Sequence, residues 1–191
     1  MQNSNGFGSS LLRRYIIGLG SNLPDRLQNL RGALSAMSFL RSVDISCIYQ
    51  SKALLLKDAP SSWNKDFLNC VVAGFSDLSP TGMLQKCKQI ELKMGRTSSH
   101  IRWSPRVIDI DILLLEDSII KTEVLGCGTL NVPHPEMLKR LFVLLPICDI
   151  APELTHPITG RTMRDHLQDL KDDPLCTRLA QEIVQYREPL R

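Results

Sequence analysis

Two aspartates, Asp109 and Asp111, are the residues of this chain best suited to do chemistry. They lie two positions apart in an otherwise apolar run over residues 107–115. If that run is a strand, both side chains point to the same face, about 6–7 Å apart, and the isoleucines around them face a core. Two carboxylates on one buried face repel each other and lose hydration, so they need a counter-charge. Mg²⁺ supplies one, and it is usually held by one or two carboxylates together with substrate phosphates.

Three arginines, Arg96, Arg102 and Arg106, lie in the polar segment before this run. Guanidinium groups match phosphate oxygens in charge and geometry. The arginines and the aspartates together therefore indicate a metal–nucleotide site. Two alternatives remain open at this point. The aspartates could face solvent in front of an apolar strand, and the arginines could promote solubility or form ion pairs with the same aspartates.

Four further side chains each have a possible role in binding or in structure. Trp103 could stack on a flat ring or anchor its loop on the core. His134, between two prolines, could bind phosphate, donate a proton or be structural. Asn69 lies inside an apolar strand, and a buried amide must be hydrogen-bonded, either to the backbone or to the amide edge of a heterocyclic ligand. Asn22, in a turn, is interpreted as a local cap.

The elements that must position these residues follow from the spacing of apolar residues. We expect strands over residues 15–19, 43–49, 67–75 and 107–115, a helix after Pro24 and another over residues 79–95. The resulting order, βαββαβ, predicts an α+β, ferredoxin-like core with a mostly antiparallel sheet and helices packed on one face. Residues 118–124 fit a short strand or part of a hairpin, and residues 54–65 a loop.

The chain divides into three parts by composition. We expect a flexible leader over residues 1–14, one domain over residues 15–170 and a helical tail or linker over residues 171–191. Two helices, over residues 162–170 and 174–186, would form a C-terminal helical extension.

The overall composition is that of an ordinary soluble domain. The 191 residues are 43% hydrophobic and 23% charged, with a net charge of +3, which gives no reason to expect nucleic-acid or membrane binding. No apolar run is long enough to span a bilayer. The cysteines have neither CxxC nor zinc spacing, so we expect reduced thiols in a cytoplasmic protein. Gly18-Leu19-Gly20 lacks the third glycine of a dinucleotide fingerprint, and there is no P-loop, so arginines and metal would have to hold a nucleotide.

Four segments in order resemble the 6-hydroxymethyl-7,8-dihydropterin pyrophosphokinase (HPPK) family of folate biosynthesis. They are residues 17–22, residues 66–69, the stretch 91–112 with its Arg-Trp-Ser-Pro-Arg-Val-Ile-Asp-Ile-Asp string, and residues 132–142. The resemblance implies transfer of a diphosphate from ATP, the co-substrate, to the hydroxymethyl group of 6-hydroxymethyl-7,8-dihydropterin, with release of AMP. It also implies fusion to, or association with, dihydropteroate synthase as an option.

The resemblance also implies roles for individual residues. Asp109 and Asp111 would hold two Mg²⁺ ions and, with Arg96 and Arg106, form the catalytic set. The ATP side would comprise Glu91, Arg96, Arg102, Trp103, Arg106, Ile112, His134 and Arg140. The pterin side would comprise Ser51, Phe67, Asn69, Trp103 and Phe142.

The sequence departs from the family pattern beside the second strand. The family usually has a Pro-rich, Gly-containing loop there, whereas residues 53–60 are leucine-rich. Ser98 and Lys88 also stand where relatives often have a basic residue and a glutamine. Two other function classes fit the same local pattern: a regulatory domain that binds a nucleotide or RNA, and an Asp-x-Asp phosphotransferase with another acceptor. The sheet has no aromatic-rich strand pair of the RNA-binding kind, which argues against RNA.

Overall fold

A computed structural model describes residues 12–96, 104–170 and 176–179. Its main sheet has the strand order β5-β1-β4-β3-β8, in which β8 is Cys176–Leu179, and β2 also pairs with β4. All these pairings are antiparallel. The core elements are β1 (Arg13–Ser21), α1 (Arg26–Ala36), β2 (Arg41–Ile45), β3 (Ile48–Ser51), β4 (Phe67–Ser76), α2 (Pro80–Lys93) and β5 (Asp109–Leu115). The predicted α+β, ferredoxin-like core is therefore confirmed.

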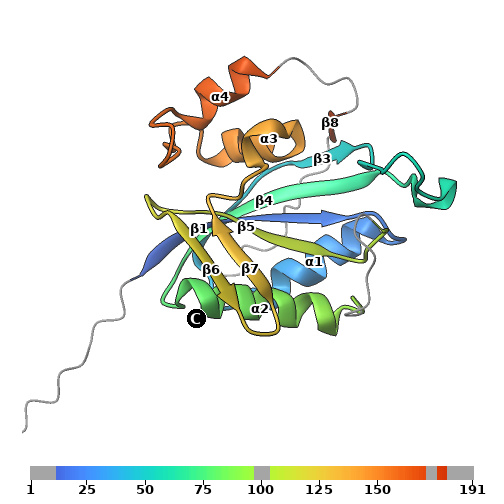
Figure 1. The fold of residues 1–191 in the computed structure, drawn as a ribbon, viewed down its shortest axis with the longest axis horizontal. Helices are drawn as coiled ribbons and strands as arrows, with labels where there is room; N and C mark the ends of the chain where they lie inside the picture. Colours follow the sequence, from blue (N-terminus) through green and yellow to red (C-terminus); the bar gives the residue numbers. More distant parts are fainter. Residues whose placement is uncertain (1–11, 97–103, 171–175, 180–191) are drawn as a thin grey trace, which may run out of the picture.

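Helices cover both faces of this sheet (Figure 1). α1 and α2 lie on one face, as predicted, and α3 (Leu141–Ile150) lies on the other, where it packs against α4 (Met163–Asp169). Two hydrophobic clusters correspond to the two faces. The expectation that helices lie on one face holds only for the βαββαβ core, since α3 and α4 follow that core in the chain.

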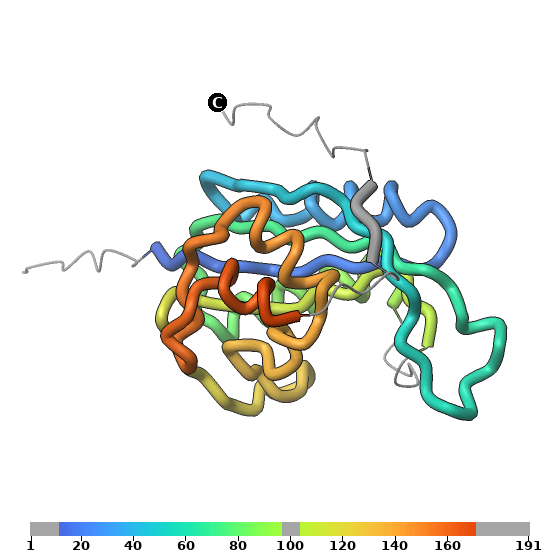
Figure 2. Tube along the Cα trace, turned by 90° about the horizontal axis from the view of Figure 1, so that it is seen from above, coloured from blue at the N-terminus to red at the C-terminus, as the bar shows by residue number. Residues whose placement is uncertain are grey.

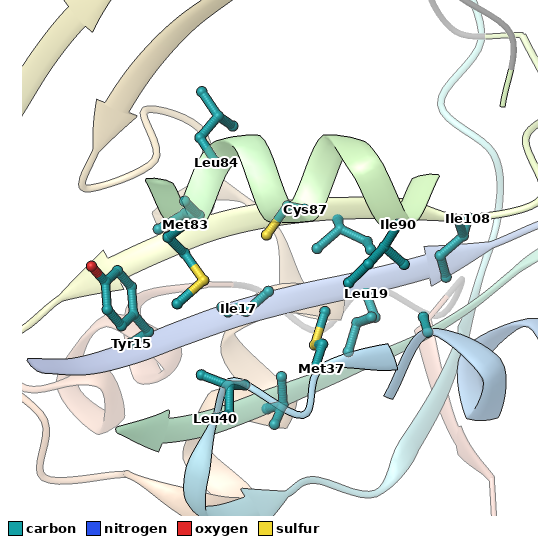
Figure 3. Close-up of a cluster of buried hydrophobic side chains, with 14 of the residues drawn as sticks. Tyr15, Ile17, Leu19, Met37, Leu40, Met83, Leu84, Cys87, Ile90 and Ile108 are labelled. Atoms are coloured by element: carbon teal, nitrogen blue, oxygen red, sulfur yellow. The ribbon is translucent and has the colours of Figure 1, made fainter. Parts of the chain in front are cut away.

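The packing of α2 shows how the sequence pattern produces the core. Ser79 caps the helix by accepting a hydrogen bond from the Gly82 N–H at 3.1 Å, and Pro80 occupies its first turn. Gly95, with φ +99°, follows the helix as predicted. Between these ends, apolar side chains at helical spacing point toward those of β1 (Figure 3).

A β-bulge in β5 sets which face each of its residues meets. Ile17 pairs with Ile112, but its neighbour Ile16 pairs with Leu114, so one residue of β5 is extra. As a result Leu113 and Leu114 both pack in the cluster on the α3 side. The two aspartates precede the bulge and share the α3-side face with Leu113.

Several peripheral segments behave as the sequence predicts. β6 (Ile120–Val124) pairs with β7 (Gly128–Val132) in a separate hairpin. The loop between β3 and β4 contains only a 3₁₀ turn, Ser61–Trp63, and projects from the body in teal and green in Figure 2. A second 3₁₀ turn, Met137–Lys139, precedes α3. No helix in the described part of the chain is long and apolar enough to cross a membrane.

Three predicted elements need correction. The single strand over residues 43–49 is broken into β2 and β3 at Ser46, whose Oγ accepts the Val71 N–H at 2.9 Å and so replaces a ladder bond. The helix over residues 174–186 is wrong at Cys176–Leu179, which form β8 on the edge of β3. That edge offers unpaired main-chain groups, a tertiary effect that helix propensity ignores. The predicted leader, residues 1–14, overlaps β1 at its end, and residues 1–11 lie outside the described ones.

Candidate active site

One cleft lies on the α3 side of the sheet, where β1, β4 and β5 meet the start of α3. Its empty space is ≈ 790 Å³, a volume that includes the part of the cleft open to solvent. The lining is of two kinds. The charged or titratable members include Arg106, Asp109, Asp111, His134 and Arg140. The aromatic, aliphatic and uncharged polar members include Ser51, Leu54, Phe67, Asn69 and Phe142.

Asp109 and Asp111 both face this cleft, as strand geometry predicts, while Ile110 between them is fully buried in the opposite cluster. Asp109 is held by two arginines: Arg96 Nη1 lies 2.6 Å from Oδ1, and Arg106 Nη1 lies 2.8 Å from Oδ2. The structure therefore confirms, for Asp109, the alternative that these arginines form ion pairs with the aspartates. Burial alone would raise the pKa of Asp109, but the charges of Arg106 and Arg96 hold it below its ordinary value.

Asp111 has a different environment from Asp109. Burial, and then the neighbouring charge of Asp109, raise the pKa of Asp111 to about 7. Among the described residues, no cationic side chain forms an ion pair with it. An unpaired carboxylate beside an ionised one is an arrangement that a bound cation relieves.

This donor set suits Mg²⁺ arriving with phosphates rather than a closed protein cage. Within the described ranges no group of three or more His, Cys, Asp or Glu side chains could hold a metal. Two cleft-facing carboxylates on one strand fit the habit of Mg²⁺, which takes one or two carboxylates plus phosphate oxygens. The residues that could hold the ion are therefore Asp109 and Asp111.

Glu91 is the buried anchor behind the aspartates. Its side chain is only 3% exposed, and Oε1 accepts the Ile110 N–H at 2.7 Å and Arg96 Nη1 at 2.6 Å. Its Oε2 accepts from Lys88 Nζ at 2.9 Å. The carboxylate thus fixes the main chain between the two aspartates and holds one arginine of Asp109. Glu91 is not among the residues that line the cleft.

Asn69 is the central polar group among the uncharged lining residues. It lies on β4, is 6% exposed and donates from Nδ2 to Ser51 Oγ at 2.9 Å and to the Tyr49 carbonyl at 3.4 Å. A Cβ built on Gly20 would lie 3.1 Å from its Oδ1 and 3.5 Å from the Phe67 ring. The glycine of β1 therefore keeps the space beside the amide oxygen open, and the backbone bond to Tyr49 confirms one of the two partners considered for Asn69.

His134 is oriented by its own loop. Its main-chain N–H donates to the Leu113 carbonyl at 2.9 Å, and its ring Nδ1 accepts the Glu136 N–H at 3.2 Å. The neutral ring must therefore carry its proton on Nε2. Burial, and then the charge of Arg140, lower the pKa of His134.

The tautomer gives a prediction that spectroscopy can check. In ¹⁵N-resolved NMR of the ligand-free protein, His134 should be an Nε2–H imidazole that protonates at lower pH than a solvent-exposed histidine, because burial and Arg140 both disfavour the cation. An Nδ1–H tautomer, or a pKa above the ordinary value, would contradict this geometry. His134→Gln provides the resonance assignment.

The structure brings most of the predicted site residues together. The predicted residues that line the cleft are Ser51, Phe67, Asn69, Arg106, Asp109, Asp111, His134, Arg140 and Phe142. Arg96 and Glu91 join them through Asp109 and Ile110. Ile112 instead packs its side chain in the core on the opposite face. Arg102 and Trp103 lie outside the described residues.

Three residues in or near the cleft have roles that the sequence does not predict. Lys52 lines the cleft and forms a 2.9 Å ion pair with Asp66, and no local pattern marks a lone lysine after a strand. Lys88 departs from the family pattern, and its side chain forms an ion pair with buried Glu91, a role that its sequence position does not indicate. The interpretation of Asn22 as a local cap is wrong, because its side chain bonds to distant main chain.

Comparisons with known proteins show which proteins this chain is similar to. Residues 16–152 match the family model described as 7,8-dihydro-6-hydroxymethylpterin-pyrophosphokinase (HPPK). The chain is 35% identical over 161 residues to an Aquifex aeolicus protein named 2-amino-4-hydroxy-6-hydroxymethyldihydropteridine pyrophosphokinase, covering 84% of this chain and 94% of that one. A Methylorubrum extorquens protein of the same name is 38% identical over 162 residues, covering 83% and 94%.

A solved structure shares the fold. A Plasmodium falciparum HPPK-DHPS triple mutant superposes with a TM-score of 0.68 at 18% identity. The match covers 88% of this chain but only 45% of the Plasmodium chain, so this chain spans under half the length of that two-part protein.

Proposed function

The chain belongs to the 7,8-dihydro-6-hydroxymethylpterin-pyrophosphokinase family, and from this premise we propose that its cleft transfers the diphosphate of ATP to 6-hydroxymethyl-7,8-dihydropterin and releases AMP. One observation carries the assignment of this reaction to this cleft. An aspartate pair with arginines, suited to metal and phosphates, lines the same cleft as the amide of Asn69 and the aromatic rings of Phe67 and Phe142, which suit a flat heterocycle.

The ATP side comprises Glu91, Arg96, Arg102, Trp103, Arg106, Ile112, His134 and Arg140. Arg106 and Arg140, with the Nε2–H of His134, supply the donors for phosphate oxygens. Glu91 acts by holding Arg96 and the β5 main chain, and Ile112 acts through its main chain, since its side chain is in the core. Arg102 and Trp103 belong to this side by their place in the family string.

Two Mg²⁺ ions would be held by Asp109 and Asp111. When bound, Mg²⁺ would neutralise charge on the phosphates and favour loss of the acceptor's hydroxyl proton. A cation held at Asp109 would weaken the ion pairs of that carboxylate with Arg96 and Arg106 by like-charge repulsion. The Arg106 guanidinium would then be available to the nucleotide, while Arg96 keeps its ion pair with Glu91.

The pterin side comprises Ser51, Phe67, Asn69, Trp103 and Phe142. The flat ring lies between aromatic side chains, and Asn69 presents its Oδ1 to the amide-rich edge of the ring. Ser51 orients that amide by accepting a hydrogen bond from Nδ2.

The reaction requires that the two substrates are positioned in line and that the charge on the phosphates is neutralised. The hydroxymethyl oxygen of the pterin attacks the β-phosphorus of ATP, and the bond from that phosphorus to the α,β-bridging oxygen breaks. AMP leaves with the bridging oxygen, and the hydroxyl proton passes to solvent. Arginines beside the reacting phosphates stabilise the charge that develops on them.

Asn69→Ala should separate the two substrates. We expect the pterin KM to rise about tenfold or more, because the ring loses its amide partner, while the ATP KM changes by less than about twofold. Asn64→Ala, in the exposed loop before β4, is the matched control and should leave both constants unchanged. Equal effects of Asn69→Ala on both KM values would place Asn69 outside the pterin side.

Acceptor dependence tests the function itself. With ATP and Mg²⁺, purified protein should form AMP in step with the pterin diphosphate, and 6-methyl-7,8-dihydropterin, which lacks the hydroxyl group, should give none. ADP as product, or AMP formation independent of the hydroxyl group, would refute the assignment.

We place the protein in the cytoplasm, supported by the free thiols of its described cysteines. We also interpret residues 171–191 as a tail or linker that could lead to, or associate with, dihydropteroate synthase, since the Plasmodium chain is an HPPK-DHPS protein.

A further inference from the structure

Asn22, in the turn between β1 and α1, bonds to both main-chain polar groups of Arg106. Its main-chain N–H donates to the Arg106 carbonyl at 3.3 Å, and its Oδ1 accepts the Arg106 N–H at 2.8 Å. Asn22 is 3% exposed, so water competes little for these bonds. The position of Arg106, and of the guanidinium that meets Asp109, therefore depends on one asparagine.

The same side chain also holds the segment that leads into β4. Asn22 Nδ2 donates to the Lys65 carbonyl at 3.3 Å. Lys65 precedes Asp66, whose carboxylate accepts from Lys52 Nζ at 2.9 Å and from Gln50 Nε2 at 2.8 Å and so closes the base of the loop between β3 and β4. Phe67, next in the chain, lines the cleft.

We propose that Asn22 is a positioning residue that couples the phosphate side of the cleft to the pterin side. The inference rests on the proposed function. If the Arg106 main chain moves, Asn22 must move with it or lose its hydrogen bonds to Arg106. If Asn22 moves, the Lys65 carbonyl that accepts from its Nδ2 is displaced as well, and Lys65 lies two residues before Phe67. Nucleotide binding at Arg106 therefore changes the affinity of the pterin side, and the reverse, by equal factors.

Two variants separate the bond of the Asn22 side chain to Arg106 from its bond to Lys65. Asn22→Ala removes both side-chain bonds. Asn22→Asp keeps an oxygen that can accept from the Arg106 N–H. It replaces the Nδ2 donor by a second oxygen, so the hydrogen bond to the Lys65 carbonyl is lost. The matched control is Asn29→Ala, because Asn29 Nδ2 bonds to Ser21 Oγ and the Pro24 carbonyl in the same turn, without reaching Arg106 or Lys65.

The experiment is a pair of calorimetric titrations of each full chain with 6-hydroxymethyl-7,8-dihydropterin, with and without α,β-methylene-ATP and Mg²⁺. In the unchanged protein the nucleotide analogue should alter the pterin Kd by about tenfold, within the usual range of coupling between sites. In Asn22→Ala this factor should fall to about two or less, with kcat reduced about 10- to 100-fold. Asn29→Ala should keep the factor of the unchanged protein.

Asn22→Asp keeps the inference testable if Asn22→Ala does not fold. Its pterin KM should rise about tenfold while its ATP KM changes by less than about threefold. The inference is overturned if a folded Asn22→Ala keeps the coupling factor, if the unchanged protein shows no coupling, or if Asn22→Asp affects the ATP KM more than the pterin KM. Failure of the unchanged protein to form AMP would instead refute the proposed function.

Discussion

Asp111→Ala is expected to lower the rate of AMP formation by about a thousandfold while the protein stays folded, because it removes one of the two carboxylates proposed to hold Mg²⁺ against the phosphates. Asp111 faces the cleft and forms no ion pair with another described residue, so its loss breaks no ion pair in the described part of the chain. The rate is measured in single turnover by chromatography of AMP. Asp117→Ala, an exposed aspartate just beyond β5, is the matched control and should retain the full rate. Retained activity in Asp111→Ala would refute the metal assignment.

The conservative variant, Asp111→Asn, should be more stable than the unchanged protein in metal-free buffer at pH 8. The ordinary carboxyl pKa of 3.8 is raised to about 7 in the fold, so the folded state binds this proton more tightly than the unfolded state does. Ionisation of Asp111 therefore costs stability as pH rises from about 4 to 7, and the cost is complete above about 7.

A pKa raised from 3.8 to about 7 sets the expected gain at no more than about 4 kcal/mol, or about 8–16 °C in Tm, and the gain should vanish near pH 4, where little of the carboxyl's ionisation cost remains. Thermal unfolding in EDTA at the two pH values measures it. Destabilisation by Asp111→Asn at pH 8 would mean that the protein stabilises the anion without metal.

Glu91→Ala should have the largest effect on stability of any single change in the site. The substitution leaves Arg96 and Lys88 without their common buried partner and the Ile110 N–H without its acceptor. Breaking a buried ion pair in this way costs about 3–5 kcal/mol, which lowers the Tm by about 6–20 °C. Activity should fall with it, because the main chain between Asp109 and Asp111 loses its anchor.

A conservative variant and a control separate stability from function. Glu91→Gln can still accept the Ile110 N–H, so it should recover part of the stability but not the ion pairs. Glu153→Gln removes the anionic partner of Arg164, an exposed pair with side chains 70% and 56% exposed. That change should shift the Tm by no more than about 2 °C. If Glu91→Ala and Glu153→Gln cost the same, Glu91 is not the buried anchor described here.

The core and the metal-facing carboxylates were predictable because both follow from local periodicity. Alternation along residues 107–112 places Ile110 in the core and Asp109 and Asp111 in the cleft, since a strand turns successive side chains to opposite faces. Helical spacing in α2 likewise predicts its buried stripe, shown in Figure 3. Such patterns need no knowledge of the partner element.

Features that depend on distant main chain could not be predicted in this way. The bulge at Leu113 depends on the pairing of β5 with β1, and β8 forms on the open edge of β3. The bonds of Asn22 cross 84 residues to Arg106 and 43 residues to Lys65. A turn asparagine has the same local sequence pattern whether it caps its own turn or holds another segment, so only the fold distinguishes the two roles.

Two phosphorus labels followed through one turnover distinguish attack at the β-phosphorus of ATP from attack at another phosphorus. With ATP labelled at the α- or the γ-phosphorus, Mg²⁺ and 6-hydroxymethyl-7,8-dihydropterin, all the α label should appear in AMP and all the γ label in the pterin product, at equal rates. Appearance of the α label in ADP, or of the γ label in inorganic phosphate or in a pterin monophosphate, would contradict attack at the β-phosphorus and with it the proposed use of this cleft.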